Sequence, residues 1–205
     1  APNPSLEKQS LEKRKGGLLK DSYRWVVENE DFNRWKDARS GQLLWVKGEP
    51  GKGKTMLLCG IIDELSRIPT SDTNIAFFFC RASEESLNTS SAVLRGLIFM
   101  LVTQQPSLMS NFKYSFDGHN SWFVLKNTLT KILNDPNLHA TYFVIDGLDE
   151  CVGDRQYLLE LLVEHSAAHE KVKWLVSSRN WLDIEQDLDG ATKMELQLES
   201  NEEIL

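Results

Sequence analysis

Residues 48–55 read GEPGKGKT. Their spacing matches G-x-x-x-x-G-K-[ST], the Walker A motif. The glycines of this loop let the backbone take turns that a Cβ atom would forbid, so that successive N–H groups can point into one concave cradle for a phosphate. In such a loop Lys54 is expected to reach the β- and γ-phosphate oxygens, and the Thr55 hydroxyl is expected to hold Mg²⁺.

The residues on either side of the loop have the pattern that the motif requires. Residues 43–46 (LLWV) form a short apolar run, as a buried strand does, and residues 56–65 (MLLCGIIDEL) read as an apolar helix. The alternative is a glycine turn between a strand and a helix that binds nothing. The order of strand, loop and helix favours phosphate binding. The expected nucleotide contacts are Gly48, Glu49, Pro50, Gly51, Lys52, Gly53, Lys54, Thr55 and Met56.

The rest of the chain alternates between strand-like and helical stretches. Strands are expected at residues 43–47, 74–80, 142–146, 173–177 and 193–198, and helices at residues 55–67, 90–105, 121–133 and 156–168. Most of the strand runs are continuously apolar, as in parallel strands that are covered on both faces. The pattern predicts an α/β P-loop NTPase fold, a five-stranded, mostly parallel sheet between two layers of helices, over residues 41–205. Residues 1–17 are expected to form a linker or a frayed helix, and residues 18–40 a helical lead-in.

Composition limits the function classes. The chain has 205 residues and a net charge of −7, which argues against a broad nucleic-acid-binding face. No apolar run approaches the length of a membrane span, and no signal peptide is visible. The three scattered cysteines are typical of buried free thiols in a reducing compartment. We therefore expect a cytoplasmic protein with neither nucleic acid nor membrane as a partner.

A second motif supplies acidic side chains. The apolar run at residues 142–145 leads into Asp146, and Asp149 and Glu150 follow closely. An apolar strand that ends in a carboxylate matches Walker B, in which the aspartate holds Mg²⁺. Asp149 and Glu150 are candidates for orienting or deprotonating the attacking water, with solvated loop carboxylates as the alternative.

A third candidate follows the next apolar run. Residues 174–176 (WLV) lead into Ser177, Ser178 and Arg179. A guanidinium group at the end of this strand can meet the γ-phosphate and stabilise charge in the transition state. The alternative is an ordinary surface arginine.

Taken together, these motifs carry a family resemblance. GEPGKGKT, AFFFC (residues 76–80), DGLDEC (146–151) and SSRNW (177–181) resemble the NACHT class of signal-transduction NTPases. The resemblance is greatest to fungal NOD-like receptors of the heterokaryon-incompatibility and nephrocystin-type group, and it extends over nearly the whole chain from about Gly16. The small residue Gly147 after Asp146, with two acids following, is typical of this class.

The resemblance implies a nucleotide switch. Members bind Mg²⁺ with ATP/ADP or GTP/GDP, hydrolyse slowly and self-associate in the triphosphate state, between an N-terminal effector and C-terminal repeats. The family's helical and winged-helix subdomains are expected to be absent from residues 41–205. Base contacts are implied at Gly16, Gly17 and Leu18, while the base itself stays open because the chain has no N/T-K-x-D guanine motif.

Two other readings of the same loop remain. The first is a nucleotide-gated oligomerisation module without significant turnover, because Gly147 stands where related ATPases carry an acid. The second is a small-molecule phosphotransferase, for which a lid with clustered arginines would be the sign. The sequence offers no such cluster.

Overall fold

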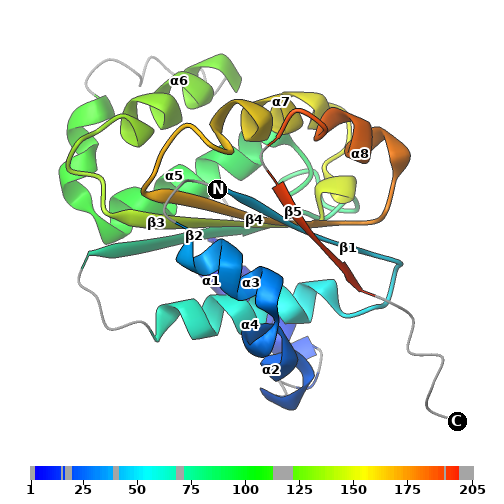
Figure 1. The fold of residues 1–205 in the computed structure, drawn as a ribbon. Coiled ribbons are helices and arrows are strands. Elements are labelled where there is room, and N and C mark those ends of the chain that lie inside the picture. Colours follow the sequence, from blue (N-terminus) through cyan, green and yellow to red (C-terminus); the bar gives the residue numbers. More distant parts are fainter. Residues whose placement is uncertain are drawn as a thin grey trace, which may run out of the picture.

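The computed structural model describes residues 3–14, 16, 20–38, 42–67, 72–112, 122–191 and 193–198. A parallel sheet with the strand order β2-β3-β4-β1-β5 lies at its centre (Figure 1). The strands are β1 (Leu43–Gly48), β2 (Thr73–Phe79), β3 (Ala140–Asp146), β4 (Val172–Ser178) and β5 (Lys193–Leu198). Each predicted strand is present, and its bounds differ from the prediction by at most two residues.

Helices cover both faces of the sheet, which confirms the predicted three-layer α/β/α fold. On one side lie α5 (Ser90–Gln104), α6 (Trp122–Leu133), α7 (Arg155–His165) and α8 (Leu182–Asp187) (Figure 1). On the other side lie α1 (Pro4–Arg14), α2 (Lys20–Glu28), α3 (Glu30–Asp37) and α4 (Lys54–Ser66).

The core lies around the central strands. Every residue of β4 is buried, and Trp174 of this strand stacks on Phe143 of β3 with ring centroids 4.3 Å apart. Trp45 of β1 is also fully buried. Because helices cover both faces, alternate side chains of a strand are buried in opposite directions, and this explains the continuous apolar runs.

The contact between α2 and α4 depends on a glycine. A Cβ atom at Gly60 would lie 2.2 Å from Cγ of Tyr23, whose ring is buried against α4. The missing side chain therefore lets the two helices approach closely. Asn29 separates α2 from α3, and its side chain accepts a hydrogen bond from the Phe32 N–H at 3.0 Å, as an N-cap residue does.

Part of the segment that the sequence suggests to be a linker or a frayed helix forms α1. Its Glu, Lys, Gln and Leu residues favour a helix, although they show no apolar face. Lys8 is nevertheless buried and pairs with Asp63 of α4 at 2.7 Å. Glu7 pairs with Arg81, which lies just after β2. These ion pairs thus add to the few apolar contacts of this helix, which come from the buried Pro4 and the partly buried Leu11.

Short elements complete the fold. The 3₁₀ turn η1 (Pro106–Phe112) follows α5, and η2 (Leu148–Glu150) follows β3. Neither these turns nor α8 were expected from the sequence. Among the described residues, no helix has the length and apolar character needed to cross a membrane.

Candidate functional site

The glycine-rich loop joins the end of β1 to the start of α4. Gly51 and Gly53 take positive φ angles of 80° and 81°, which L side chains rarely adopt. Gly53 is the N-cap of α4, and no side chain caps the helix there. The first N–H groups of the helix are therefore available to an anion, and the helix dipole favours negative charge at the same place. Residues 49–53 are exposed to solvent.

Lys54 lies back over its own loop. Its Nζ donates to the carbonyl oxygens of Gly48 at 2.6 Å and Glu49 at 3.0 Å. Burial lowers the pKa of Lys54, although Asp149 and Asp146 act in the opposite direction. The ammonium group therefore lies within the loop, with two backbone acceptors as its partners.

Thr55 and Asp146 meet across the site. The Thr55 hydroxyl, in the first turn of α4, donates to Asp146 Oδ2 at 2.7 Å. Asp146 ends β3 and is buried, and burial raises the pKa of its carboxyl group against the effect of hydrogen bonds from Ser177 and Thr55. Two residues 91 positions apart in the chain thus form one oxygen-rich corner.

The chemistry of this corner fits Mg²⁺. A hydroxyl oxygen and a carboxylate are hard ligands, and Mg²⁺ usually takes one or two protein ligands together with phosphate oxygens and water. Among the described residues there is no cluster of three or more His, Cys, Asp or Glu side chains that could hold a metal by itself. A magnesium ion here would therefore depend on the ligand for most of its coordination.

Asp149 and Arg179 form an ion pair. Asp149 Oδ2 accepts from Arg179 Nε at 3.0 Å, and Oδ1 accepts from the Arg179 backbone N–H, also at 3.0 Å. The Asp149 side chain is 4% exposed, whereas that of Arg179 is 43% exposed. The guanidinium also lies over the Trp181 ring, 5.6 Å from its centroid. Both oxygens of Asp149 are thus engaged by Arg179.

Glu150 has a different environment. It is half-buried, and its Oε2 accepts a hydrogen bond from the Ala82 N–H at 3.2 Å. This contact links the end of η2 to the loop after β2. The side chain keeps one oxygen with no hydrogen bond to a described residue.

The structure brings together the residues of both Walker motifs, whereas of the three predicted base contacts Gly16, Gly17 and Leu18 it describes only Gly16. Gly16 lies in the turn after α1, where its N–H donates to the Lys13 carbonyl at 3.3 Å. Gly17 and Leu18 lie outside the described residues. Met56 is half-buried in the first turn of α4.

Ser177 is a site residue that sequence reasoning missed. Its hydroxyl donates to Asp146 Oδ1 at 2.5 Å and accepts from the Gly147 N–H at 3.0 Å. The signal that could have found it is its place at the end of the strand that pairs with β3. A serine at that point faces the residue that ends its neighbour.

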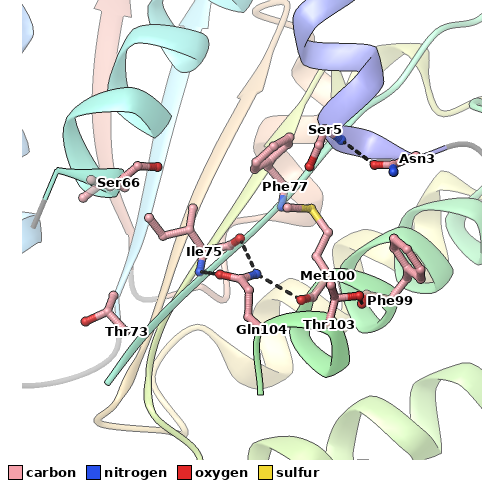
Figure 2. Close-up of a pocket in the computed structure, with 11 residues that line it drawn as sticks. Asn3, Ser5, Ser66, Thr73, Ile75, Phe77, Phe99, Met100, Thr103 and Gln104 are labelled. Carbon is pink, nitrogen blue, oxygen red and sulfur yellow. Dashed lines mark hydrogen bonds between the residues drawn. The ribbon is translucent and has the colours of Figure 1, made fainter. Parts of the chain in front are cut away.

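A cavity of about 410 Å³ lies elsewhere, at the outer edge of β2 (Figure 2). Ile75 and Phe77 of β2 line it, together with Met100 and Gln104 of α5. The Gln104 amide accepts from the Ile75 N–H at 3.0 Å and donates to the Ile75 carbonyl at 2.9 Å. No residue of the glycine-rich loop lines this cavity, so it is separate from the site built around Lys54.

Comparison with known proteins places the chain in a family. The family model described as "Nephrocystin 3, N-terminal" matches residues 21–179. The chain is 51% identical over 210 residues to the vegetative incompatibility protein HET-E-1 of Podospora anserina. That alignment covers 98% of this chain but only 15% of HET-E-1.

Solved structures share the fold at low identity. The Walker-type ATPase of Pyrococcus abyssi aligns with a TM-score of 0.53 and 15% identity, over 90% of this chain and 54% of that one. The ORC1 protein of Aeropyrum pernix aligns with a TM-score of 0.52 and 14% identity, over 87% of this chain and 44% of that one. These likenesses confirm the fold.

Proposed function

The chain belongs to the family described as nephrocystin 3, N-terminal, and on this premise we propose that it binds a nucleoside triphosphate with Mg²⁺ and hydrolyses it slowly. The 51% identity to HET-E-1 also bears out the resemblance to the NACHT domains of fungal NOD-like receptors. The domain would act as the nucleotide switch of a longer protein, with an effector before it and repeats after it. Self-association in the triphosphate state and a cytoplasmic location are part of the same proposal.

The observation that carries the proposal is the 2.7 Å contact between Thr55 and Asp146. These are the residues that the two Walker motifs assign to Mg²⁺, and they meet although a long stretch of chain separates them. Bound Mg²⁺ would offset the negative charge of the β- and γ-phosphate oxygens. Thr55 and Asp146 would hold it from the protein side.

Lys54 would exchange its partners on binding. The two loop carbonyls that now accept from its ammonium group are neutral, whereas phosphate oxygens carry formal charge. An ammonium group that meets anionic phosphate oxygens gains a Coulombic attraction that neutral carbonyl groups do not supply. Lys54 is therefore expected to turn from the carbonyls of Gly48 and Glu49 to the β- and γ-phosphates.

Among the candidates for water positioning, the contacts favour Glu150 over Asp149. Asp149 already gives both oxygens to Arg179, and its side chain is almost fully buried. Glu150 keeps an oxygen for a water molecule. We assign to Asp149 the holding of Arg179, and to the exposed guanidinium of Arg179 the contact with the γ-phosphate.

The test is a titration of the purified chain with ATP and with GTP, in EDTA and in Mg²⁺. Tight binding that Mg²⁺ strengthens is expected for at least one of them, and it should be lost in Lys54→Ala. Unchanged affinity in Lys54→Ala would overturn the assignment of the loop. Mass-spectrometric identification of any nucleotide that copurifies would name the base.

A second candidate function is nucleotide-gated oligomerisation without significant turnover. It is favoured by the pairing of Asp149 with Arg179, because only one carboxylate, that of Glu150, is then left to position a water molecule. Stoichiometric retention of unhydrolysed triphosphate with Mg²⁺ would favour this function, whereas steady release of phosphate would exclude it.

A further inference from the structure

Ser177 is fixed between two groups at the end of β4. Its side chain is fully buried. The hydroxyl donates to Asp146 Oδ1 at 2.5 Å and accepts from the Gly147 N–H at 3.0 Å. A hydroxyl has one hydrogen and two lone pairs, so both contacts can be made at once. Ser177 therefore bridges a carboxylate and the backbone that follows it.

The two oxygens of Asp146 have different partners from different elements. Oδ1 is held by Ser177 of β4, and Oδ2 faces the Thr55 hydroxyl of α4. Because Ser177 occupies Oδ1, the carboxylate plane is fixed and Oδ2 stays turned toward the glycine-rich loop. The Thr55 contact is the one that a ligand would rearrange, while the Ser177 contact lies on the buried side.

The second contact of Ser177 acts on the turn after β3. Gly147 takes a φ of 72°, and the chain turns there directly after Asp146 to enter η2. The N–H group at this turn is satisfied by the Ser177 hydroxyl. Loss of the hydroxyl would leave a buried N–H and a buried carboxylate oxygen without that partner.

We propose that Ser177 is a positioning residue for the metal site, which holds Asp146 in the orientation that binds Mg²⁺ together with Thr55. The inference rests on the proposed function, because it takes Asp146 as a ligand of the Mg²⁺ that accompanies the nucleotide. Groups that hydrogen-bond to a metal ligand typically contribute about 10- to 100-fold to metal affinity. A single buried hydroxyl at Oδ1 has the geometry for such an effect.

The experiment measures nucleotide affinity against Mg²⁺ concentration, in the chain and in Ser177→Ala. The nucleotide is ATP or GTP, whichever the unmodified chain binds. We expect the affinity in EDTA to stay the same in Ser177→Ala. The Mg²⁺ concentration that gives half of the gain in affinity should rise about tenfold or more.

Ser178→Ala is the matched control. Ser178 is the next residue of β4 and is equally buried, but its hydroxyl donates to the Arg179 carbonyl and accepts from Trp45 Nε1. Its substitution removes a hydroxyl from the same strand without touching Asp146, so the Mg²⁺ midpoint should not move. An equal shift in both variants would mean general loosening of β4 and would overturn the proposal.

Two conservative variants test the role of Ser177 if circular dichroism shows that Ser177→Ala is unfolded. Ser177→Thr keeps a hydroxyl and should keep the Mg²⁺ midpoint, whereas Ser177→Cys keeps a side chain with only a weak donor and should raise it. A folded Ala or Cys variant with an unchanged midpoint would overturn the role of Ser177. An unmodified chain whose nucleotide affinity does not depend on Mg²⁺ would instead overturn the proposed function.

Discussion

Among single residues, Glu150 is the one whose change should separate binding from hydrolysis. Glu150→Gln keeps the size of the side chain and its acceptor for the Ala82 N–H, but it removes the basic carboxylate. We expect nucleotide affinity to stay unchanged and turnover to fall about 100-fold, within the range that general bases contribute. Single-turnover phosphate release measures the chemical step directly.

Glu85→Gln is the control for this substitution. Glu85 is exposed in the loop after β2, and the substitution makes the same change of charge close to the segment that Glu150 contacts. Its turnover should equal that of the unmodified chain. If turnover in Glu150→Gln matched the control, the positioning of water would have to be assigned to Asp149 or to a partner protein.

For single residues, the sequence predicts a role where the residue is part of a motif of neighbouring positions. Lys54 and Thr55 stand in a fixed spacing, and Asp146 ends an apolar run, so their chemistry can be read from neighbours in the chain. Ser177 has no such signature. Its contact with Asp146 arises only from the parallel pairing of β3 with β4. The sequence around a serine in a strand does not show which residue of the neighbouring strand it will face.

At the scale of helices, the packing of α2 on α4 gives a test. Gly60→Ala would place a Cβ atom 2.2 Å from the Tyr23 ring, so either the ring or α2 must move. We expect the free energy of unfolding to fall by about 1–3 kcal/mol, the usual cost of overpacking. Denaturant unfolding followed by circular dichroism measures it.

Ser66→Ala is the control on the same helix. Ser66 is exposed near the end of α4, and its substitution should change stability by less than about 0.5 kcal/mol. If Gly60→Ala were as stable as this control, the result would contradict the close packing of α2 on α4.

The end of α7 should make stability depend on pH. His165 is buried beside His169, with Nδ1 and Nε2 3.2 Å apart. Burial lowers the pKa of both histidines; for His165, Glu164 opposes this effect, and His169 and Lys126 add to it. A histidine with a lowered pKa binds fewer protons when folded than when unfolded. The free energy of unfolding should therefore fall as the pH drops below about 6.5, the unfolded value.

His165→Leu tests this dependence. Leucine cannot take up a proton, so the loss of stability between pH 7 and pH 5 should be smaller than in the unmodified chain, as measured by denaturant unfolding across that range. A variant whose stability falls as steeply as that of the unmodified chain would show that His165 does not contribute.

The elements that the sequence predicts differ from the others in how many apolar side chains they bury. The strands and α4 to α7 bury many apolar side chains, and that burial leaves apolar runs that can be recognised in the sequence. In α8 only Ile184 is buried, and in α1 only Pro4 and Lys8 are buried, with Lys8 paired to Asp63. A helix with so few buried apolar side chains leaves no apolar run to detect in the sequence.

For the whole molecule, the attachment of α1 is the feature to test. Lys8→Met keeps the length of the side chain and removes the charge that pairs with Asp63. Asp63 is 38% exposed, so solvent screens the pair and we expect a loss of roughly 1 kcal/mol. Hydrogen exchange of α1 should then become about fivefold faster, while exchange in β3 stays the same.

Lys13→Met, an exposed position on the same helix, is the control and should leave exchange unchanged. If Lys8→Met were also unchanged, the ion pair with Asp63 would not be what attaches α1 to the sheet layer.

The architecture as a whole was the most predictable property. Alternation of strands and helices, with a glycine-rich loop after β1, allows few arrangements, because crossovers between parallel strands are right-handed and ligands bind at the carboxyl ends of the strands. The strand order places β1 between β4 and β5, and it brings β3 beside β4. The pattern did not predict which side chains meet across neighbouring strands, as Asp146 and Ser177 do.

The amide of Gln104 has a consequence for how copies of this domain can meet. β2 is an edge strand, and an exposed edge is a template on which another chain can add a strand and begin to aggregate. By engaging both the N–H and the carbonyl of Ile75, the Gln104 side chain takes the place that a foreign strand would need. At Ile75, the addition of a strand to the β2 edge is thus blocked by one of the domain's own side chains.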